Sequence, residues 1–217
     1  MSQGQKALVS QWRGAHAVGG RRRHMQALED FLRTHDTGDL LDIACGGGAF
    51  TRRVLDGSKS HGHVTGLDIN ADVGVGFLSN IDGDDVTFVA SPIAAYLDGG
   101  HAFDTVSVSN ALHHLEGVGD ILRDVRGVVR PDGVVIIHEM YADGLNPPQE
   151  TQRDIHAMIA QLHRVQGEYH RAAYTRQEIL DFLDGAGLTV RHRFEALNDD
   201  APVEKGTDGF AGRGIQT

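Results

Sequence analysis

Short apolar runs alternate with amphipathic stretches along most of the chain. The apolar runs predict β-strands over Leu40–Ala44, Val64–Ile69, Val86–Ala90, Phe103–Ser109 and Val134–His138. Polar and apolar residues alternate over Leu188–Phe194, which predicts a sixth strand nearer an edge of the sheet. Helical periodicity is clearest over Thr51–Leu55, Val118–Val129 and Thr175–Ala186, which lie between these runs. Strands that alternate with helices need crossover connections. The pattern therefore predicts an α/β fold with a doubly wound, mostly parallel sheet and helices on both faces.

The two ends of the chain do not follow this alternation. Residues 1–36 predict an N-terminal helical lid or cap, in which a short helix over Ala7–Trp12 precedes a break at Gly19-Gly20. The helix after the break has an apolar stripe at Met25, Leu28, Phe31 and Leu32. Residues 198–217 are polar and glycine-rich and predict a tail, so the main domain is expected over residues 37–197.

One long helix is predicted over Gln149–His170, in an insertion at residues 149–172 between the fifth and sixth strands. Its apolar face consists of Ile155, Met158, Ile159, Leu162, Val165 and Tyr169. His156, His163 and His170 recur every seven residues and form a stripe beside that face. Seven residues of continuous helix rise about 10.5 Å, whereas the ligands of one metal ion lie at about 2 Å. The spacing therefore predicts that these three histidines do not share an ion.

Composition and charge narrow the class of protein. The length of 217 residues suits one α/β domain, and the formal net charge of −10 argues against nucleic acid as a partner. No apolar run approaches the roughly 20 residues of a membrane helix, and Met1–Ser10 lacks a secretory signal core, so we expect no membrane partner and a cytoplasmic location. Cys45 is the only cysteine, which excludes an intrachain disulfide and a cysteine-based zinc site.

The segment Leu40–Phe50, LLDIACGGGAF, carries the strongest chemical signal. Its strand ends at Ala44, and Gly46–Gly48 turn sharply into a helix, so a ligand can approach the backbone and the unpaired N–H groups of the helix start. Asp68 ends the second strand, where a carboxylate can accept both hydroxyls of a ribose. A dinucleotide-binding loop would read G-x-G-x-x-G, but Thr51 occupies the place of the third glycine.

A different pattern, D-x-A-C-G-x-G, is matched throughout by Asp42–Gly48. In this respect the segment resembles the first motif of the class I S-adenosylmethionine-dependent methyltransferases, whose cofactor carries an amino group and a sulfonium. Gly66–Asn70 resembles the second motif of that family, Asn110–Leu115 its N-x-L-H-H-L stretch, and Arg130–Ile136 its turn into the fifth strand. The resemblance implies a Rossmann-like sheet, S-adenosylmethionine as cofactor and S-adenosylhomocysteine as product.

The resemblance also implies which residues contact the cofactor. They are Asp42, Ala44, Cys45, Gly46, Gly48, Asp68, Ile69, Ser91, Pro92, Ile93 and Asn110. Ser91 stands where the family often has an aspartate that binds the adenine amino group, and the family's usual seventh strand is not legible in the tail. Asp42 could instead order the glycine loop, and Asp68 could cap the following helix, but their places in the motifs favour the cofactor.

Histidines near the strand ends are the candidates for catalysis. His113 and His114 follow the fourth strand and His138 ends the fifth, at the edge of a parallel sheet where ligands bind. Each is a candidate general base, with packing as the alternative. His138, Glu139 and one helical histidine, His156, are the candidates for a metal site, and whether a metal is bound stays open.

These features predict a methyltransferase that acts on a small-molecule acceptor by in-line methyl transfer, as a monomer or homodimer. Two alternatives remain. One is a domain that binds the cofactor and a partner protein without catalysis, and the other is an NAD-dependent oxidoreductase.

Overall fold

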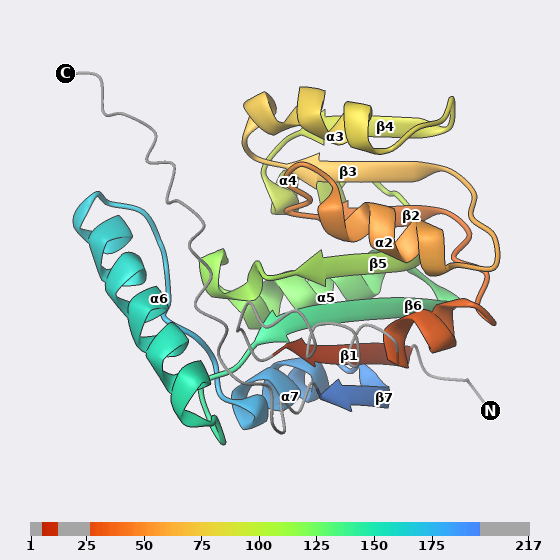
Figure 1. Cartoon of the computed structure of the whole chain (residues 1–217). Helices are drawn as coiled ribbons and strands as arrows, with labels where there is room; N and C mark the ends of the chain where they lie inside the picture. Colours follow the sequence, from red (N-terminus) through yellow and green to blue (C-terminus); the bar gives the residue numbers. More distant parts are fainter. Residues whose placement is uncertain (1–5, 13–26, 196–217) are drawn as a thin grey trace.

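A seven-stranded parallel sheet forms the centre of the chain (Figure 1). The computed structural model describes residues 6–12 and 27–195, with side chains described over residues 27–193. The sheet order is β4-β3-β2-β5-β6-β1-β7, and each neighbouring pair described is parallel. The strands are β1 (Lys6–Trp12), β2 (Leu40–Ile43), β3 (Val64–Asp68), β4 (Val86–Ala90), β5 (Phe103–Ser109), β6 (Val129–Met140) and β7 (Thr189–Glu195). The predicted fold class is confirmed, and each predicted strand overlaps one of β2 to β7.

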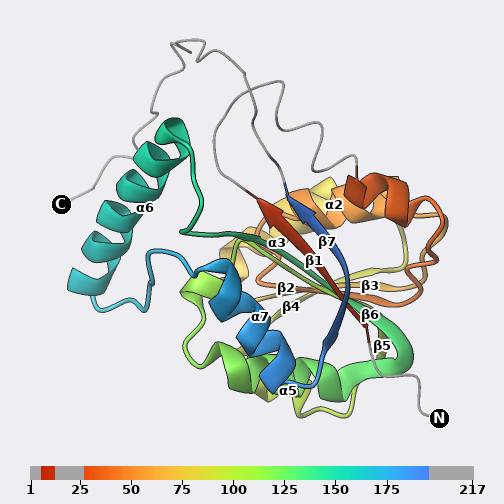
Figure 2. The same ribbon diagram turned by 90° about the horizontal axis from the view of Figure 1, so that it is seen from below.

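Helices cover both faces of this sheet (Figure 2). α2 (Ala49–Gly57) and α3 (Gly74–Asn80) lie on one face, and α5 (Val118–Val128) and α7 (Arg176–Gly185) lie on the other. The remaining short elements are α4 (Ile93–Leu97), η1 (Ala71–Val73) and η2 (Leu112–His114). The core has two apolar clusters, because successive side chains of β6 alternate between them: Val135 and Ile137 belong to one, Val134 and Ile136 to the other. A central parallel strand is buried on both faces in this way.

The N-terminal segment differs from the prediction. The helix expected over Ala7–Trp12 is wrong: these residues belong to β1, which runs between β6 and β7. An apolar run this short fits a strand buried on both faces as well as a helix, so periodicity alone does not separate the two. Residues 27–32 are helical as predicted, and Leu28 and Leu32 are fully buried in the core. The rest of the predicted lid, at residues 13–26, and the tail at 198–217 lie outside the described residues.

The inserted helix is shorter than predicted. α6 (Pro147–Val165) begins with a capping box between Asn146 and Gln149, and it ends before His170 because Gly167, at φ +88°, turns the chain. Figures 1 and 2 show α6 standing beyond the carboxyl ends of the strands. Its apolar face is 39–81% exposed, at Ile155, Met158, Ile159, Leu162 and Val165. None of the described helices has the length and apolar character that crossing a bilayer requires.

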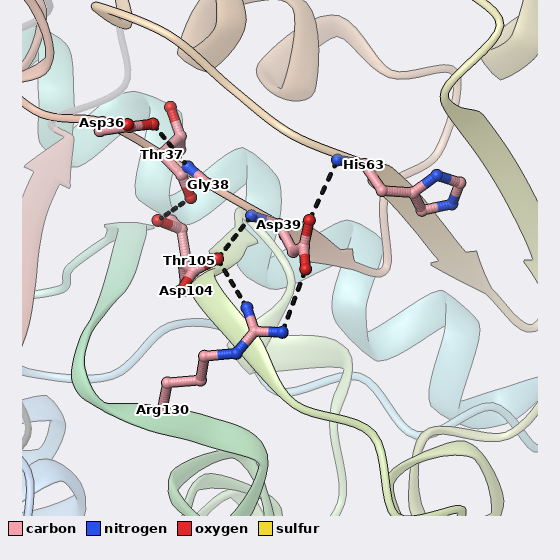
Figure 3. Close-up of polar contacts among 8 residues, drawn as sticks. All are labelled: Asp36, Thr37, Gly38, Asp39, His63, Asp104, Thr105 and Arg130. Carbon is pink, nitrogen blue, oxygen red and sulfur yellow. Dashed lines mark hydrogen bonds and ion pairs between the residues drawn. The ribbon is translucent and has the colours of Figure 1, made fainter.

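The amino ends of β2, β5 and β6 are joined by a network of charged groups (Figure 3). The guanidinium of Arg130 donates to Asp104 Oδ2 at 2.6 Å and to Asp39 Oδ2 at 3.1 Å. Asp104 Oδ2 also accepts from the Asp39 backbone N–H at 2.8 Å. Gly38 has φ +54°, and a Cβ there would lie 2.3 Å from Asp104 Oδ2, so only glycine fits this turn. The network holds the strands in register at the edge opposite the glycine loop.

Candidate functional site

The candidate site lies where the strand order reverses, at the carboxyl ends of β2 and β5. From this point the chain proceeds outward to β3 and β4 on one side and to β6 on the other. The two non-glycine residues with positive φ in the described chain both lie here, Ala44 at φ 53° and Asn110 at φ 48°. Strained backbone gathers at ligand sites, and open α/β sheets bind ligands at such reversals. The two observations point to the same place.

The glycine loop leaves free space at this point. A Cβ added to Gly46 or Gly47 would meet no atom within 4 Å. A Cβ added to Gly48, at φ +80°, would instead lie 3.0 Å from the buried ring of Phe77. Gly46 and Gly47 therefore border the space where a ligand can approach the backbone, whereas Gly48 is needed for packing against α3.

Asp42 lies beneath the loop and is only 1% exposed. Its Oδ1 accepts from the Ser107 hydroxyl at 2.6 Å, and its Oδ2 accepts from the Thr51 hydroxyl at 2.5 Å. Burial raises the pKa of Asp42 to about 6, and the two hydroxyls act in the opposite direction. The carboxyl group thus ties β2 to β5 and to the start of α2. This is the loop-ordering role considered above, while contact with the cofactor stays a prediction.

Asp68 connects the glycine loop to the end of β3. Its Oδ2 accepts from the Gly46 N–H at 2.9 Å, and its Oδ1 accepts from the Asn70 N–H at 2.9 Å. The cap of the following turn is Asn70, whose side chain accepts from the Asp72 N–H. Ile69, beside Asp68, is 77% exposed. The capping alternative for Asp68 is therefore wrong, and its carboxylate lies at the border of the open loop.

The other residues expected to contact the cofactor surround the same loop ends. The Ser91 N–H donates to the Asp68 carbonyl at 3.1 Å, and Pro92 and Ile93 begin α4 directly afterwards. The Asn110 side chain is exposed at the end of β5. Cys45 is buried, which raises the pKa of its thiol and fits a filler rather than a nucleophile.

His138 and Glu139 lie on opposite faces of β6, since successive strand residues alternate. His138 Nδ1 is 2.9 Å from the Ser109 hydroxyl, and its ring stacks on Phe50 of α2 with centroids 5.1 Å apart. Glu139 is 1% exposed, and its Oε1 is 2.9 Å from His113 Nδ1. The structure therefore separates His138 from the other two metal candidates, and a site shared by His138 and Glu139 is wrong.

Five imidazoles gather on the Glu139 side. His113, His114 and His170 each offer one ring nitrogen, and these three nitrogens lie within 4.8 Å of one another. His170 Nε2 is 3.2 Å from His156 Nε2, and His170 Nδ1 is 2.9 Å from His163 Nδ1. Burial and the neighbouring imidazoles lower the pKa of His170 to about 4, so the ring is neutral at pH 7.

The sequence did not predict this cluster. The argument that His156, His163 and His170 lie too far apart assumed a continuous helix, but α6 ends at Val165 and His170 folds back onto the other two. Gly167, two residues after the helix, is the signal that could have revealed the turn. Contact of His156 and His170 with His113 also requires η2 and α6 to face each other, which spacing does not show.

Comparisons with known proteins found similarity to a methyltransferase domain in sequence and to solved structures in fold. Residues 41–135 match a family model described as a methyltransferase domain. A structure of the complex between the Haloferax volcanii Trm112 methyltransferase activator and a methyltransferase is similar, with a TM-score of 0.61 and 17% identity over 85% of this chain and 76% of that one. No curated protein matches the sequence.

Two cyclopropane synthases are also similar. One, from Mycobacterium tuberculosis, gives a TM-score of 0.54 and 19% identity over 80% of this chain and 66% of that one. The other, a mycolic acid cyclopropane synthase solved with SAH, gives a TM-score of 0.55 and 14% identity over 75% of this chain and 60% of that one. The present chain thus spans less than two thirds of the length of either synthase, and the likeness is one of fold.

Proposed function

Because the chain has the fold of the class I S-adenosylmethionine-dependent methyltransferases and carries their domain signature over residues 41–135, we propose that it transfers a methyl group from S-adenosylmethionine to a small-molecule acceptor. The observation that carries the proposal is the open loop at Gly46 and Gly47 with Asp68 at its border. When bound, the cofactor supplies an electrophilic methyl group on a sulfonium.

The residues around the loop suit that cofactor. Each Asp68 oxygen accepts one backbone N–H and keeps a lone pair, so the carboxylate can also accept ribose hydroxyls. Ile69 offers an exposed apolar side chain beside it for a purine ring, and Ser91 can accept a hydrogen bond at the end of β4. Asp42, held by Ser107 and Thr51, keeps the loop in shape and places negative charge near a cationic ligand.

The chain's part in the chemistry is mainly to hold two reactants in line and to exclude water between them. An oxygen or sulfur acceptor must lose a proton, whereas an amine near its own pKa need not. Of the three histidines considered above, His138 packs on Phe50, in the first turn of the helix that follows the glycine loop, and is the candidate base. His113 and His114 belong instead to the imidazole cluster. The net charge of −10 favours a small molecule over nucleic acid as acceptor.

Calorimetric titration of the purified chain with S-adenosylhomocysteine, and with NAD as the control ligand, tests the cofactor assignment. Wild type should bind the first and not the second. Asp68→Ala should weaken binding by roughly 10- to 100-fold, because hydrogen bonds to a charged group are lost. Asp72→Ala removes an exposed acid four residues further along and is the matched control, with affinity unchanged. Unchanged affinity in folded Asp68→Ala would overturn the ribose assignment.

Turnover separates an enzyme from a domain that only binds. A panel of phenols, thiols and amines, assayed for S-adenosylhomocysteine release, should contain an acceptor. His138→Gln should slow transfer to an oxygen acceptor while leaving S-adenosylhomocysteine affinity intact. Binding without release for every acceptor class would favour the non-catalytic alternative, and binding of NAD alone would favour an oxidoreductase.

A further inference from the structure

We propose that His113, His114, His156 and His170 bind one transition-metal ion, which fastens α6 to η2 at the carboxyl end of β5. The site uses none of the residues proposed above to contact the cofactor. It differs from the site considered from the sequence because His138 is not part of it.

The separations between ring nitrogens suit a single ion. Zn²⁺ binds imidazole nitrogen at about 2.0–2.1 Å, so two ligands of one tetrahedral ion lie about 3.3 Å apart. His156 Nε2 and His170 Nε2 are 3.2 Å apart already. The nitrogens of His113, His114 and His170 lie within 4.8 Å of one another, and small side-chain rotations would bring them to that separation. The rings of His113 and His156 meet edge to face with centroids 4.8 Å apart, which brings the fourth ligand to the group.

Two of these rings, those of His113 and His170, are already oriented by a contact at the ring nitrogen that would not bind the ion. His113 Nδ1 faces Glu139 Oε1 at 2.9 Å, which leaves Nε2 as the nitrogen for the ion. Glu139 is itself held by the Leu112 N–H at 2.8 Å and the Met140 N–H at 2.9 Å. His170 Nδ1 faces His163 in the same way, which leaves its Nε2 beside His156. A carboxylate behind a ligating histidine is the arrangement that fixes ring orientation in zinc sites.

The donor set selects the kind of ion. Four imidazole nitrogens favour Zn²⁺, Cu²⁺, Ni²⁺ or Co²⁺ over Mg²⁺ and Ca²⁺, which prefer oxygen. Four protein ligands in a tetrahedral arrangement are typical of structural zinc. Zn²⁺ is therefore the ion that we expect.

The position of the ligands explains what the ion would do. His113 and His114 belong to η2, whereas His156 belongs to α6 and His170 to the segment after it. Within α6, Gln149 and Ala160 are the buried residues described, and its apolar face is exposed. Apolar packing thus anchors this helix weakly, and an ion linking the two elements would hold α6 in place.

The test uses the full chain without an affinity tag, stripped by chelator and titrated with Zn²⁺ against a chromophoric competitor. Wild type should bind one ion per chain with a dissociation constant below roughly 1 µM. Both His114→Ala and His170→Ala should weaken Zn²⁺ binding at least about 100-fold. Because His114 is exposed, we expect His114→Ala to keep the native fold. Glu139→Gln should weaken it roughly 10- to 100-fold. His61→Ala, an exposed histidine at the far edge, should have no effect.

Two further measurements make the result decisive. Co²⁺ in place of Zn²⁺ should give the strong visible absorption of tetrahedral nitrogen coordination in wild type and not in His114→Ala. At a free Zn²⁺ concentration that saturates wild type but lies below the dissociation constant of the variant, Zn²⁺ should raise the melting temperature of wild type and leave that of His114→Ala unchanged. Less than one ion per wild-type chain, or equal binding in His114→Ala with circular dichroism showing a native fold, would overturn the proposal.

Discussion

Replacing Asp42 with asparagine tests whether the carboxyl group beneath the glycine loop keeps its proton up to a pH of about 6, well above the ordinary value of an aspartate. Asparagine keeps the shape of the side chain and can still hydrogen-bond to the Ser107 and Thr51 hydroxyls, but it cannot ionise. The comparison therefore isolates the titration of one buried group.

The magnitude follows from the shift of the Asp42 pKa from 3.8 to about 6. Between these values the folded chain holds a proton that the unfolded chain has lost, so the free energy of unfolding falls as pH rises. The contribution is fully present below pH 3.8 and is lost as pH passes about 6. A shift of about 2.2 units at about 1.36 kcal/mol per unit amounts to about 3 kcal/mol.

The assay is urea unfolding followed by circular dichroism, at pH values from about 4 to about 7. The free energy of unfolding of wild type minus that of Asp42→Asn should fall by up to about 3 kcal/mol across this range. Other titrating groups cancel in the difference. A difference that stays flat would refute the reasoning, since it would mean that the Ser107 and Thr51 hydroxyls fully offset the burial of the charge.

Two further changes test the packing of the sheet. In Gly66→Ala the new Cβ would lie 2.3 Å from Cζ of Phe77, whose ring is fully buried. We therefore expect the free energy of unfolding in urea to fall by about 1–3 kcal/mol. An equal fall when the same change is made in Phe77→Leu would contradict the clash. Arg130→Met removes the ion pairs to Asp39 and Asp104, which are partly exposed, so the expected loss is only about 1 kcal/mol and should shrink in high salt. A salt-independent loss would contradict that account.

Much of the fold could be predicted from the sequence because central parallel strands are apolar on both faces. Val134–Ile137 of β6 is such a run, and β2, β3 and β5 are short segments rich in apolar residues and buried along most of their length. β1 could not be assigned in this way, because Ala7, Leu8 and Val9 form a run too short to show a period. Its place in the sheet depends on pairing with residues more than a hundred positions away, which local patterns do not encode.

In the candidate site, too, some contacts could be predicted from the sequence and others could not. Gly46 and Asp68 could be placed together from the motif, and the hydrogen bond between them agrees. The partners of Asp42 could not, because Ser107 comes from a strand whose register is set by the whole sheet. The imidazole cluster depends on the turn at Gly167, where one residue decides whether His170 continues α6 or folds back.

The position of β1 has a consequence for how the chain reaches its native state. Lys6 pairs with Val134 on one side and with Thr189 on the other, so β1 is synthesised long before the two strands that flank it. The sheet is complete only when nearly the whole domain has been synthesised, and such distant pairings slow folding. Until β1 is inserted, the edges of β6 and β7 are open to other chains. Synthesis of this protein should therefore depend on chaperones more than a domain of its size built from neighbouring hairpins would.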